Sequence, residues 1–442
     1  MQRSKLRFIA RWTVPAAMFL GAAGCSGAAS DEPREDEPQP GSDRQSVVPT
    51  IGSGSGSDII LGTLDQAVPE RYIVALRDDV DALQPAVDGL VAQYGGQARF
   101  TFTHAIKGFS VSMPEAAARA LAANPQVRYV SRVQISQLSA TQQNPPWGLD
   151  RIDQRDLPVS NSYTYPDSAG EGVTAYLLDT GVKRSHPDFE NRVSAGYDFV
   201  DNDADPNDCH GHGTHTAGTV LSKTYGVAKK AKGVALRVLG CDGRGTSEQS
   251  LKAFDWVVRN RKLPAVLNYS IVFASGDRAI DEGAKKVSAA GVVFFTAAGN
   301  DNRDACSSYS PARVSELVTV GATNKKDGRA LPSDWNGVNG SNYGRCLDLF
   351  GPGTGVVSTG LSGTTATMNG TSMATPHVAG VAALYLAGHP SATPQQVRDA
   401  LVTGAVAKVT GAGLDTTNLL VNTGFTSSEQ STDELSREGG MP

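Results

Sequence analysis

The chain has 442 residues, of which 40% are hydrophobic and 19% charged, and its formal net charge is −5. This length predicts a large domain together with accessory segments rather than a single compact unit. The small negative charge and the lack of a lysine or arginine run argue against a nucleic-acid-binding protein, so we expect no nucleic-acid partner.

The N-terminus has the pattern of an export signal. Basic residues precede an apolar run over 14–20, which is too short to span a bilayer as a helix. Residues 22–25 resemble a bacterial lipoprotein cleavage box, which makes Cys25 a candidate for lipidation. Ala22 stands where leucine is usual, so ordinary signal cleavage stays open. We expect a signal peptide over residues 1–25.

Two segments of contrasting composition follow. Residues 26–66 are rich in acidic residues, glycine and serine, and we expect a disordered linker. Residues 67–139 predict strand, helix, strand, strand, helix, strand, which is the ferredoxin-like α+β arrangement. The expected strands are 71–76, 99–103, 108–113 and 127–130, and the expected helices follow the apolar positions from 80 to 94 and residues 114–123.

Residues 140–423 alternate strand and helix patterns. Strands are expected at 231–239, 265–269 and 292–297, and helices at 247–260 and 278–290. Such alternation predicts an α/β fold with a doubly wound parallel sheet, whose functional site lies at the carboxyl ends of the strands. The apolar stripe of a helix over 372–387 is expected to pack in the core. The tail over 424–442 is polar, and we expect it to be disordered.

Three motifs in this part carry chemistry. Asp179 ends an apolar strand before a glycine turn, and His212 lies on a glycine-rich turn that enters a helix. Ser372 follows Gly370 at the start of the helix over 372–387. On its own this serine segment reads equally well as a capping turn. Asp, His and Ser in this chain order, at strand ends and helix starts, are the parts of a Ser-His-Asp hydrolase.

With these motifs the chain resembles the subtilisin-like serine proteases, on the proteinase K and aqualysin side. The matching segments are 179–181, 212–218, 297–300 and 370–380, and the resemblance spans about residues 147–420. It implies that His212 is the general base, oriented by Asp179, and that Ser372 is the nucleophile. It also implies that Asn300 donates to the oxyanion. The substrate-binding residues that it implies are Ser270, Val272, Ala298 and Gly299.

The resemblance further implies a secreted, monomeric serine endopeptidase that hydrolyses proteins and peptides through an acyl-enzyme. It is made as an autoprocessed precursor, in which residues 67–139 are an inhibitor propeptide and intramolecular chaperone. Cleavage is expected near Ser139–Ala140, which would leave any lipid on Cys25 with the removed part. Three alternatives stay open: a catalytically impaired homologue that acts as a binding protein, a zinc site at the histidines of 210–215, and an ordinary accessory domain in place of the propeptide.

Two disulfides are implied by the resemblance. They join Cys209 to Cys241 and Cys306 to Cys346 and leave Cys25 as the odd cysteine. Buried free thiols are the alternative, because spacing alone does not fix the pairing.

Calcium is the expected cofactor. Five oxygen-bearing side chains cluster within 13 residues and match a family calcium loop: Asp150, Asp153, Gln154, Ser160 and Ser162. A second family site would use Asp348 with the carbonyls of Ser315 and Leu317, and a third would use Asp198 and Asp203. Plain solvated surface is the alternative for such acidic loops.

The chain departs from the family pattern in two places. Val272 and Phe273 stand where relatives carry glycines on the edge that pairs with substrate, so the substrate preference stays open. Residues 333–340 are an insertion, which we expect near the loop of Asp348.

Overall fold

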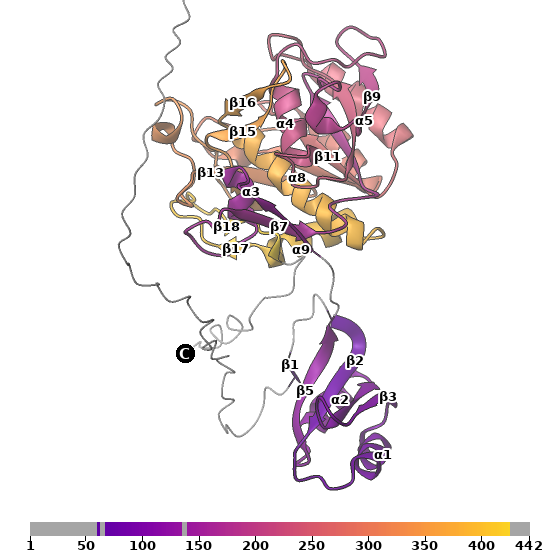
Figure 1. The fold of residues 1–442 in the computed structure, drawn as a ribbon. Coiled ribbons are helices and arrows are strands. Elements are labelled where there is room, and N and C mark those ends of the chain that lie inside the picture. Colours follow the sequence, from indigo (N-terminus) through magenta and orange to yellow (C-terminus); the bar gives the residue numbers. More distant parts are fainter. Residues whose placement is uncertain (1–59, 62–66, 135–138, 425–442) are drawn as a thin grey trace, which may run out of the picture. The chain divides into compact units, whose positions relative to one another are not determined.

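The computed structural model describes residues 60–61, 67–134 and 139–424 (Figure 1). Cys25, the signal peptide, most of the linker and the polar tail lie outside these residues, and the predictions for them stay predictions. Within the described part of the chain, no helix is long and apolar enough to cross a bilayer. The described residues form two parts on either side of 135–138, and each is treated by itself.

The N-terminal part is a five-stranded sheet with two helices, and its strand order is β1-β5-β2-β4-β3. Its elements are β1 (Ile60–Leu61), β2 (Ala67–Leu76), α1 (Leu83–Tyr94), β3 (Gln97–Phe102), β4 (Gly108–Ser112), α2 (Glu115–Ala122) and β5 (Val127–Gln134). Leu90 of α1 and Leu121 of α2 pack with Val74 and Phe109 of the sheet in one buried cluster. From β2 onward the element order and the sheet order are the expected ferredoxin-like ones.

The larger part is built on a nine-stranded sheet of order β17-β18-β14-β13-β12-β11-β8-β10-β9, parallel except between β17 and β18. Its strands are β8 (Thr174–Asp179), β9 (Val193–Asp198), β10 (Lys232–Arg237), β11 (Ala265–Tyr269), β12 (Val292–Ala297), β13 (Val318–Thr323), β14 (Leu349–Pro352), β17 (Val406–Ala407) and β18 (Leu419–Leu420). The central strands are buried throughout, which explains their continuous apolar runs.

Helices cover both faces of this sheet. On one face lie α4 (His212–Leu221), α8 (Thr371–Gly388) and α9 (Pro394–Gly404), and on the other lie α5 (Ser247–Asn260) and α6 (Arg278–Ala289). Strand β8 alternates between them: Ala175 and Leu177 join the first core cluster, while Tyr176 and Leu178 join the second. The doubly wound α/β fold is thereby confirmed. Figure 1 shows α8, the helix that begins beside Ser372, crossing the middle of this part.

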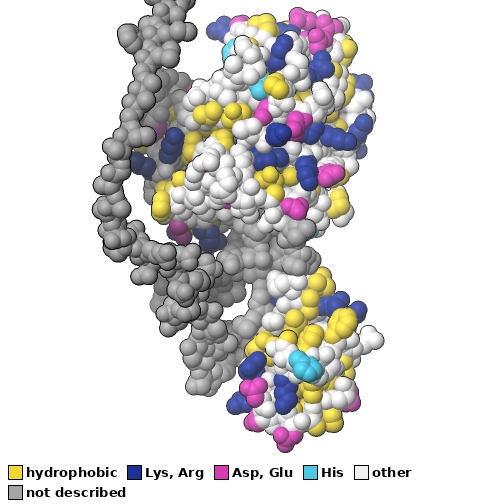
Figure 2. Space-filling model, viewed as in Figure 1, with side chains coloured by type: hydrophobic (Ala, Val, Ile, Leu, Met, Phe, Trp, Pro, Cys, Tyr) yellow, Lys and Arg dark blue, Asp and Glu magenta, His cyan; other side chains and the backbone are white. Residues whose placement is uncertain are grey.

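Shorter elements complete the larger part. They are β6 (Ser139–Gln143), α3 (Trp147–Ile152), β7 (Ser162–Pro166), β15 (Val356–Thr359), β16 (Thr365–Met368), α7 (Ala305–Ser308) and the 3₁₀ turns η1 (Pro187–Phe189) and η2 (Pro332–Asp334). Both expected disulfides are present, Cys209–Cys241 and Cys306–Cys346. On the face drawn in Figure 2, basic and acidic side chains are interspersed.

Candidate active site

Ser372 is the second residue of α8, after the N-cap Gly370 and Thr371. The φ angle of Gly370 is +150°, a value that glycine adopts without strain. Because Ser372 is so near the helix start, its backbone N–H has no intrahelical acceptor and can donate to a ligand. The turn predicted from the sequence therefore exposes a hydroxyl and an amide together.

Asp179 and His212 meet between a strand end and a helix start. Asp179 is the last residue of β8, His212 is the first of α4, and Nδ1 of His212 lies 2.6 Å from Oδ1 of Asp179. The contact requires a close approach of the two segments. A Cβ atom on Gly213 would lie 2.1 Å from the carbonyl oxygen of Gly181, so only glycine fits there.

The charge of Asp179 makes the imidazole of His212 easier to protonate. Burial disfavours the imidazolium, but the carboxylate of Asp179 outweighs it through charge and hydrogen bonding, and the pKa of His212 is raised above its usual 6.5. The side chain of Asp179 is 1% exposed, and its Oδ1 also accepts from the N–H of Thr180 at 2.8 Å. Asp179 is thus fixed against His212.

Asp208 organises the loop before α4, and sequence reasoning missed it. This buried carboxylate accepts from Gly211 N, from Thr214 N and Oγ1, and from Thr180 Oγ1, all within 2.9 Å. It thereby ties the start of α4 to the turn after β8, the two segments that carry His212 and Asp179. The available signal was an aspartate shortly before a predicted helix start, where it can satisfy free N–H groups.

Asn300 is held so that its amide nitrogen stays available. Its Oδ1 accepts from the backbone N–H of Thr371 at 2.9 Å and from Thr371 Oγ1 at 2.8 Å. With the oxygen engaged beside the N-terminus of α8, the Nδ2 group is the part of the side chain free to bind a developing anion. Ser372 N and Asn300 Nδ2 are thus two donors near the start of α8, the number that an oxyanion hole needs.

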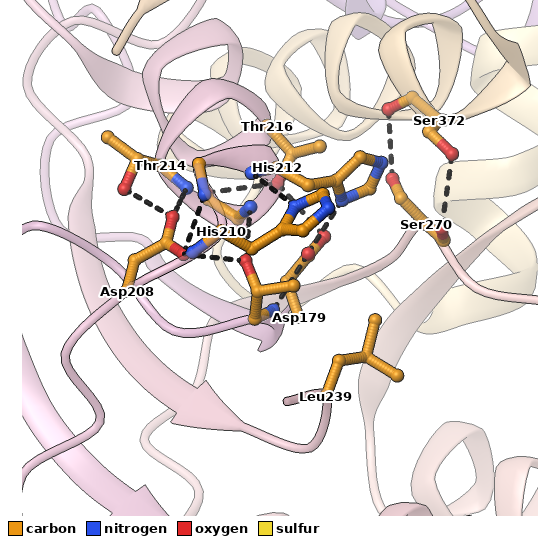
Figure 3. A network of polar contacts seen from close by, with 12 residues as sticks. Asp179, Asp208, His210, His212, Thr214, Thr216, Leu239, Ser270 and Ser372 are labelled. Atoms are coloured by element: carbon orange, nitrogen blue, oxygen red, sulfur yellow. Dashed lines mark hydrogen bonds and ion pairs between the residues drawn. The ribbon is translucent and has the colours of Figure 1, made fainter. Parts of the chain in front are cut away.

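The hydroxyl of Ser372 donates to the backbone oxygen of Ser270, at 3.2 Å. Figure 3 shows His212 between Asp179 and Ser372, but no hydrogen bond joins His212 to Ser372 among the residues described. Catalytic hydrogen bonds are often unformed before substrate binds. A rotation about the Cα–Cβ bond of Ser372 would turn its Oγ away from Ser270.

The other two histidines of this segment point elsewhere. His215 is buried, its Nε2 lies 3.0 Å from the carbonyl oxygen of Val356, and burial lowers its pKa to about 4. His210 Nδ1 accepts from the backbone N–H of His212. With each ring engaged by a different partner, the three imidazoles do not converge, and the zinc alternative has no ligand set here.

In the segment after β11, the backbone of Val272 is left without a hydrogen-bond partner among the described residues. Phe273 exchanges both backbone hydrogen bonds with Ser310, at 2.8 and 3.0 Å, and its side chain packs against the core cluster under α5 and α6. Val272 instead packs against a cluster that contains Ala298 and Tyr309. The backbone of Val272 has no partner within the described part of the chain. The two residues at the family's glycine positions therefore differ: Val272 lies beside the predicted substrate-binding Ala298, and Phe273 does not.

The first expected calcium loop contains an unsatisfied carboxylate. Asp150 and Asp153 are close enough to interact, and burial, with the charge of Asp150 adding to it, raises the pKa of Asp153 to about 7. Oδ1 of Asp153 is buried and has no hydrogen-bond partner in the described chain. Ser160 connects the loop, because its N–H donates to Asp150 and to Oε1 of Gln154, and its Oγ lies 2.8 Å from Oγ of Ser162. Oxygen donors and an orphaned carboxylate fit a hard cation such as Ca²⁺.

The second and third expected sites do not fit in the same way, because one carboxylate in each already faces a guanidinium. Arg398 Nε lies 2.8 Å from Asp348, beside the segment of Ser315 and Leu317, and Arg237 Nη1 lies 2.7 Å from Asp198. Asp203 pairs with Asp198 only through the backbone. An arginine thus lies where the sequence predicts calcium at each place, and calcium at these two sites stays a prediction.

The insertion over 333–340 pairs with the chain around Asn300, and its expected place near the loop of Asp348 stays a prediction. Its last residue pairs with the chain around Asn300: Gly340 N donates to Asn300 O at 3.0 Å, and Asn302 N donates to Gly340 O at 2.9 Å. A segment identified in the sequence only as an insertion thus pairs with the backbone of Asn300. Sequence reasoning had no signal for this pairing, since it joins segments 40 residues apart.

An α/β doubly wound sheet with an aspartate-histidine pair beside a helix-start serine defines a serine hydrolase. Comparison with known proteins gives the family: residues 170–433 match the Subtilase family, and the chain belongs to it. It is a serine endopeptidase of that family.

Relatives agree over most of the chain. An extracellular serine proteinase of Thermus sp. (strain Rt41A) is 43% identical over 383 residues, which cover 81% of this chain and 91% of the relative. Proteinase R of Parengyodontium album is 38% identical, with 73% of this chain and 80% of the relative covered. A solved cold adapted subtilisin-like serine proteinase is 47% identical, with a TM-score of 0.60, 64% of this chain and 99% of that structure covered.

Proposed function

We propose that the protein is a secreted endopeptidase that cleaves proteins and peptides through an acyl-enzyme on Ser372. The observation that carries this is the contact of Asp179 with His212 beside the start of α8. Ser372 Oγ attacks the substrate carbonyl while His212 takes its proton and then gives it to the departing amine. Water, activated by the same imidazole, releases the acyl group. Secretion is supported by the name of the extracellular Thermus relative.

The remaining residues stabilise charge during these steps. Asp179 keeps Nδ1 of His212 protonated and favours the imidazolium. Asn300 Nδ2 and the N–H of Ser372 donate to the oxyanion, and the engaged Oδ1 of Asn300 fixes that donor in advance. The open backbone at Val272, with Ser270, Ala298 and Gly299 around it, supports pairing with an extended peptide.

Autoprocessing of a precursor is the second part of the proposal. The expected cleavage bond, Ser139–Ala140, lies in β6, where these residues pair with Pro166 and Tyr165 of β7. A bond being cut must instead extend along the edge near Ser270, so the β6–β7 pairing has to open at Ser139 and Ala140 before cleavage. The ferredoxin-like part before it would be the inhibitor and folding aid. Ser372→Ala, purified free of other proteases, should keep this bond intact.

Calcium is proposed at the first loop only, held by Asp150, Asp153, Gln154, Ser160 and Ser162. Bound there, the ion would neutralise the buried carboxylate of Asp150 and the half-buried one of Asp153 and so stabilise the folded chain. It takes no part in peptide hydrolysis.

Covalent labelling tests the proposed function. A fluorophosphonate should modify Ser372 of the processed protein and abolish peptide hydrolysis, and Ser372→Ala should neither label nor cleave. A chelator added at low temperature, where the fold persists, should leave labelling intact. A folded wild-type protein that binds peptides but neither labels nor cleaves would establish the binding-protein alternative.

A further inference from the structure

The insertion over 333–340 forms one wall of a cleft beside the catalytic residues. The cleft has a volume of about 350 Å³, and its lining includes Trp335, Asn336 and Asn339 of the insertion together with His212 and Asn300. A segment that seemed to be only an addition to the family pattern thus reaches the place where the peptide bond is cut.

The wall is held in position from both ends. At its end, Gly340 pairs with the backbone on both sides of Asp301, at Asn300 and Asn302. At its start, Oδ2 of Asp334 accepts from Leu331 N at 2.8 Å and from Asn324 Nδ2 at 3.2 Å. The ring of Trp335 packs in part against the main core cluster. Its orientation is therefore set by packing.

The cleft lies on the leaving-group side of the scissile bond. The acyl half of a substrate pairs with the backbone near Val272 and Ala298, and neither residue lines the cleft. His212, which gives a proton to the departing amine, does line it. The first substrate residue after the cleaved bond is called P1′. Its side chain is the part of a substrate that would enter this cleft.

The lining selects by size and charge. Trp335 faces a cleft that also contains the thioethers of Met368 and Met373, and sulfur–aromatic contacts suit a large apolar guest. The amides of Asn336 and Asn369 are polar but uncharged, and apart from His212 no ionisable side chain lines the cleft among the residues described. A charged P1′ side chain would lose water there without meeting an opposite charge.

We propose that residues 333–340 form part of the S1′ subsite, the pocket that receives the P1′ side chain. They give the enzyme a preference for large uncharged P1′ residues, aromatic or long aliphatic. This inference rests on the proposed function, because it assumes that a peptide bond is cleaved here and that its leaving-group side lies in the cleft. It goes beyond that function by naming which substrates are cleaved fastest.

The test is kcat/KM on internally quenched peptides that differ only at P1′, with phenylalanine, leucine, glycine, lysine or aspartate. The wild type should prefer phenylalanine and leucine over glycine by about 10-fold or more, as expected where the P1′ side chain contacts Trp335 and the two thioethers. Trp335→Ala should lower the phenylalanine-to-glycine ratio by about 5-fold or more, and Trp335→Phe should keep most of it. If the variant also displaces Asn300, kcat/KM falls equally for both peptides, and the ratio between them does not change.

A charge variant tests the same subsite without removing packing. Asn336 is exposed, and its Oδ1 accepts from Val338 N and Asn339 N, which an aspartate can also do. Asn336→Asp should raise cleavage before lysine and lower cleavage before aspartate. The matched control is Val338→Asp, because Val338 is 76% exposed in the same loop and does not line the cleft. It should leave the P1′ profile unchanged.

A flat P1′ profile in the wild type would overturn the inference, and so would ratios that Trp335→Ala and Asn336→Asp leave unchanged. Failure of the proposed function looks different. A peptide methyl ester has no P1′ residue, so an enzyme that hydrolyses it and labels at Ser372 retains the proposed function whatever its P1′ profile. A processed wild type that hydrolyses neither ester nor peptide contradicts the function itself.

Discussion

Ser270 and Ser372 exchange two hydrogen bonds across the site: Oγ of Ser270 donates to the backbone oxygen of Ser372 at 3.0 Å, and Oγ of Ser372 donates to that of Ser270 at 3.2 Å (Figure 3). The first bond joins the end of β11 to the first turn of α8. It therefore fixes the backbone of the nucleophile against the strand edge proposed to bind substrate.

Ser270→Ala removes the first of these bonds and keeps the backbone edge. We expect kcat to fall about 2- to 10-fold, the worth of one net hydrogen bond, while KM changes little. Steady-state kinetics on one peptide measures both constants. Ser275→Ala, at an exposed position of the same loop, is the control. An effect on KM alone would mean that Ser270 serves binding and not the position of Ser372.

The pH dependence of activity should follow His212. Only the neutral imidazole accepts a proton, so activity rises with pH through its pKa, and that pKa is raised above 6.5 mainly because Asp179 outweighs burial. The acid limb of kcat/KM should therefore have its midpoint above 6.5. In Asp179→Asn burial remains and the attraction is gone, so the midpoint should move down while the rate falls about 10⁴-fold. An unmoved midpoint in the variant would assign the limb to another group.

Val272 and Phe273 should affect different properties, although both stand at family glycine positions. Val272→Gly opens space beside Ala298 and should increase kcat/KM for large P1 residues relative to alanine by about 10-fold or more. Phe273→Gly removes a side chain that packs against the core cluster under α5 and α6. It should therefore lower the free energy of unfolding by about 2 kcal/mol and leave the P1 preference unchanged. A P1-varied peptide series and thermal unfolding distinguish the two. Identical P1 profiles in Val272→Gly and wild type would place Val272 outside the groove.

Arg398 should act as the internal counter-charge of Asp348. The carboxylate of Asp348 is 6% exposed, and burial raises its pKa in spite of Arg398. Arg398→Ala should lower the free energy of unfolding by about 1 to 3 kcal/mol, because it leaves a buried carboxylate without a counter-charge, bound only by the N–H of Thr319. Asp348→Asn with Arg398→Ala should recover part of that loss in a double-mutant cycle. Additive losses would show that the two side chains are not coupled.

Site residues could be predicted from the sequence where the signal lies in residues close along the chain. Asp179 at a strand end, His212 after a glycine and Ser372 at a helix start were each predicted from their neighbours, and the parallel sheet then brings such ends together. Counter-charges were not predictable in this way. Arg237 reaches Asp198 from the adjacent strand β10, 39 residues away, so one of the two aspartates read as a cation site already has a counter-charge. Trp335 reaches the cleft only because its loop pairs beside Asn300.

The first calcium loop gives the sharpest stability test, because Asp153 has opposite effects with and without the ion. Asp153→Asn keeps the shape of the side chain and removes a charge that lies buried near Asp150. In EGTA, where nothing neutralises the two carboxylates, the variant should melt at a higher temperature than the wild type. In excess calcium the order should reverse, since the wild type gains about 2.7 kcal/mol at a hundredfold excess over its Kd and the variant gains much less.

Thermal unfolding of the processed, inhibited enzyme in both buffers measures this reversal. Asp203→Asn serves as the matched control, because Asp203 lies at the place where Arg237 already supplies the charge of its neighbour Asp198. Its response to calcium should equal that of the wild type. Equal calcium responses in wild type and Asp153→Asn would remove the ion from this loop. The raised pKa of Asp153 would then reflect a buried carboxyl that stays protonated near neutral pH, and the wild type in EGTA would lose stability as the pH rises toward about 7.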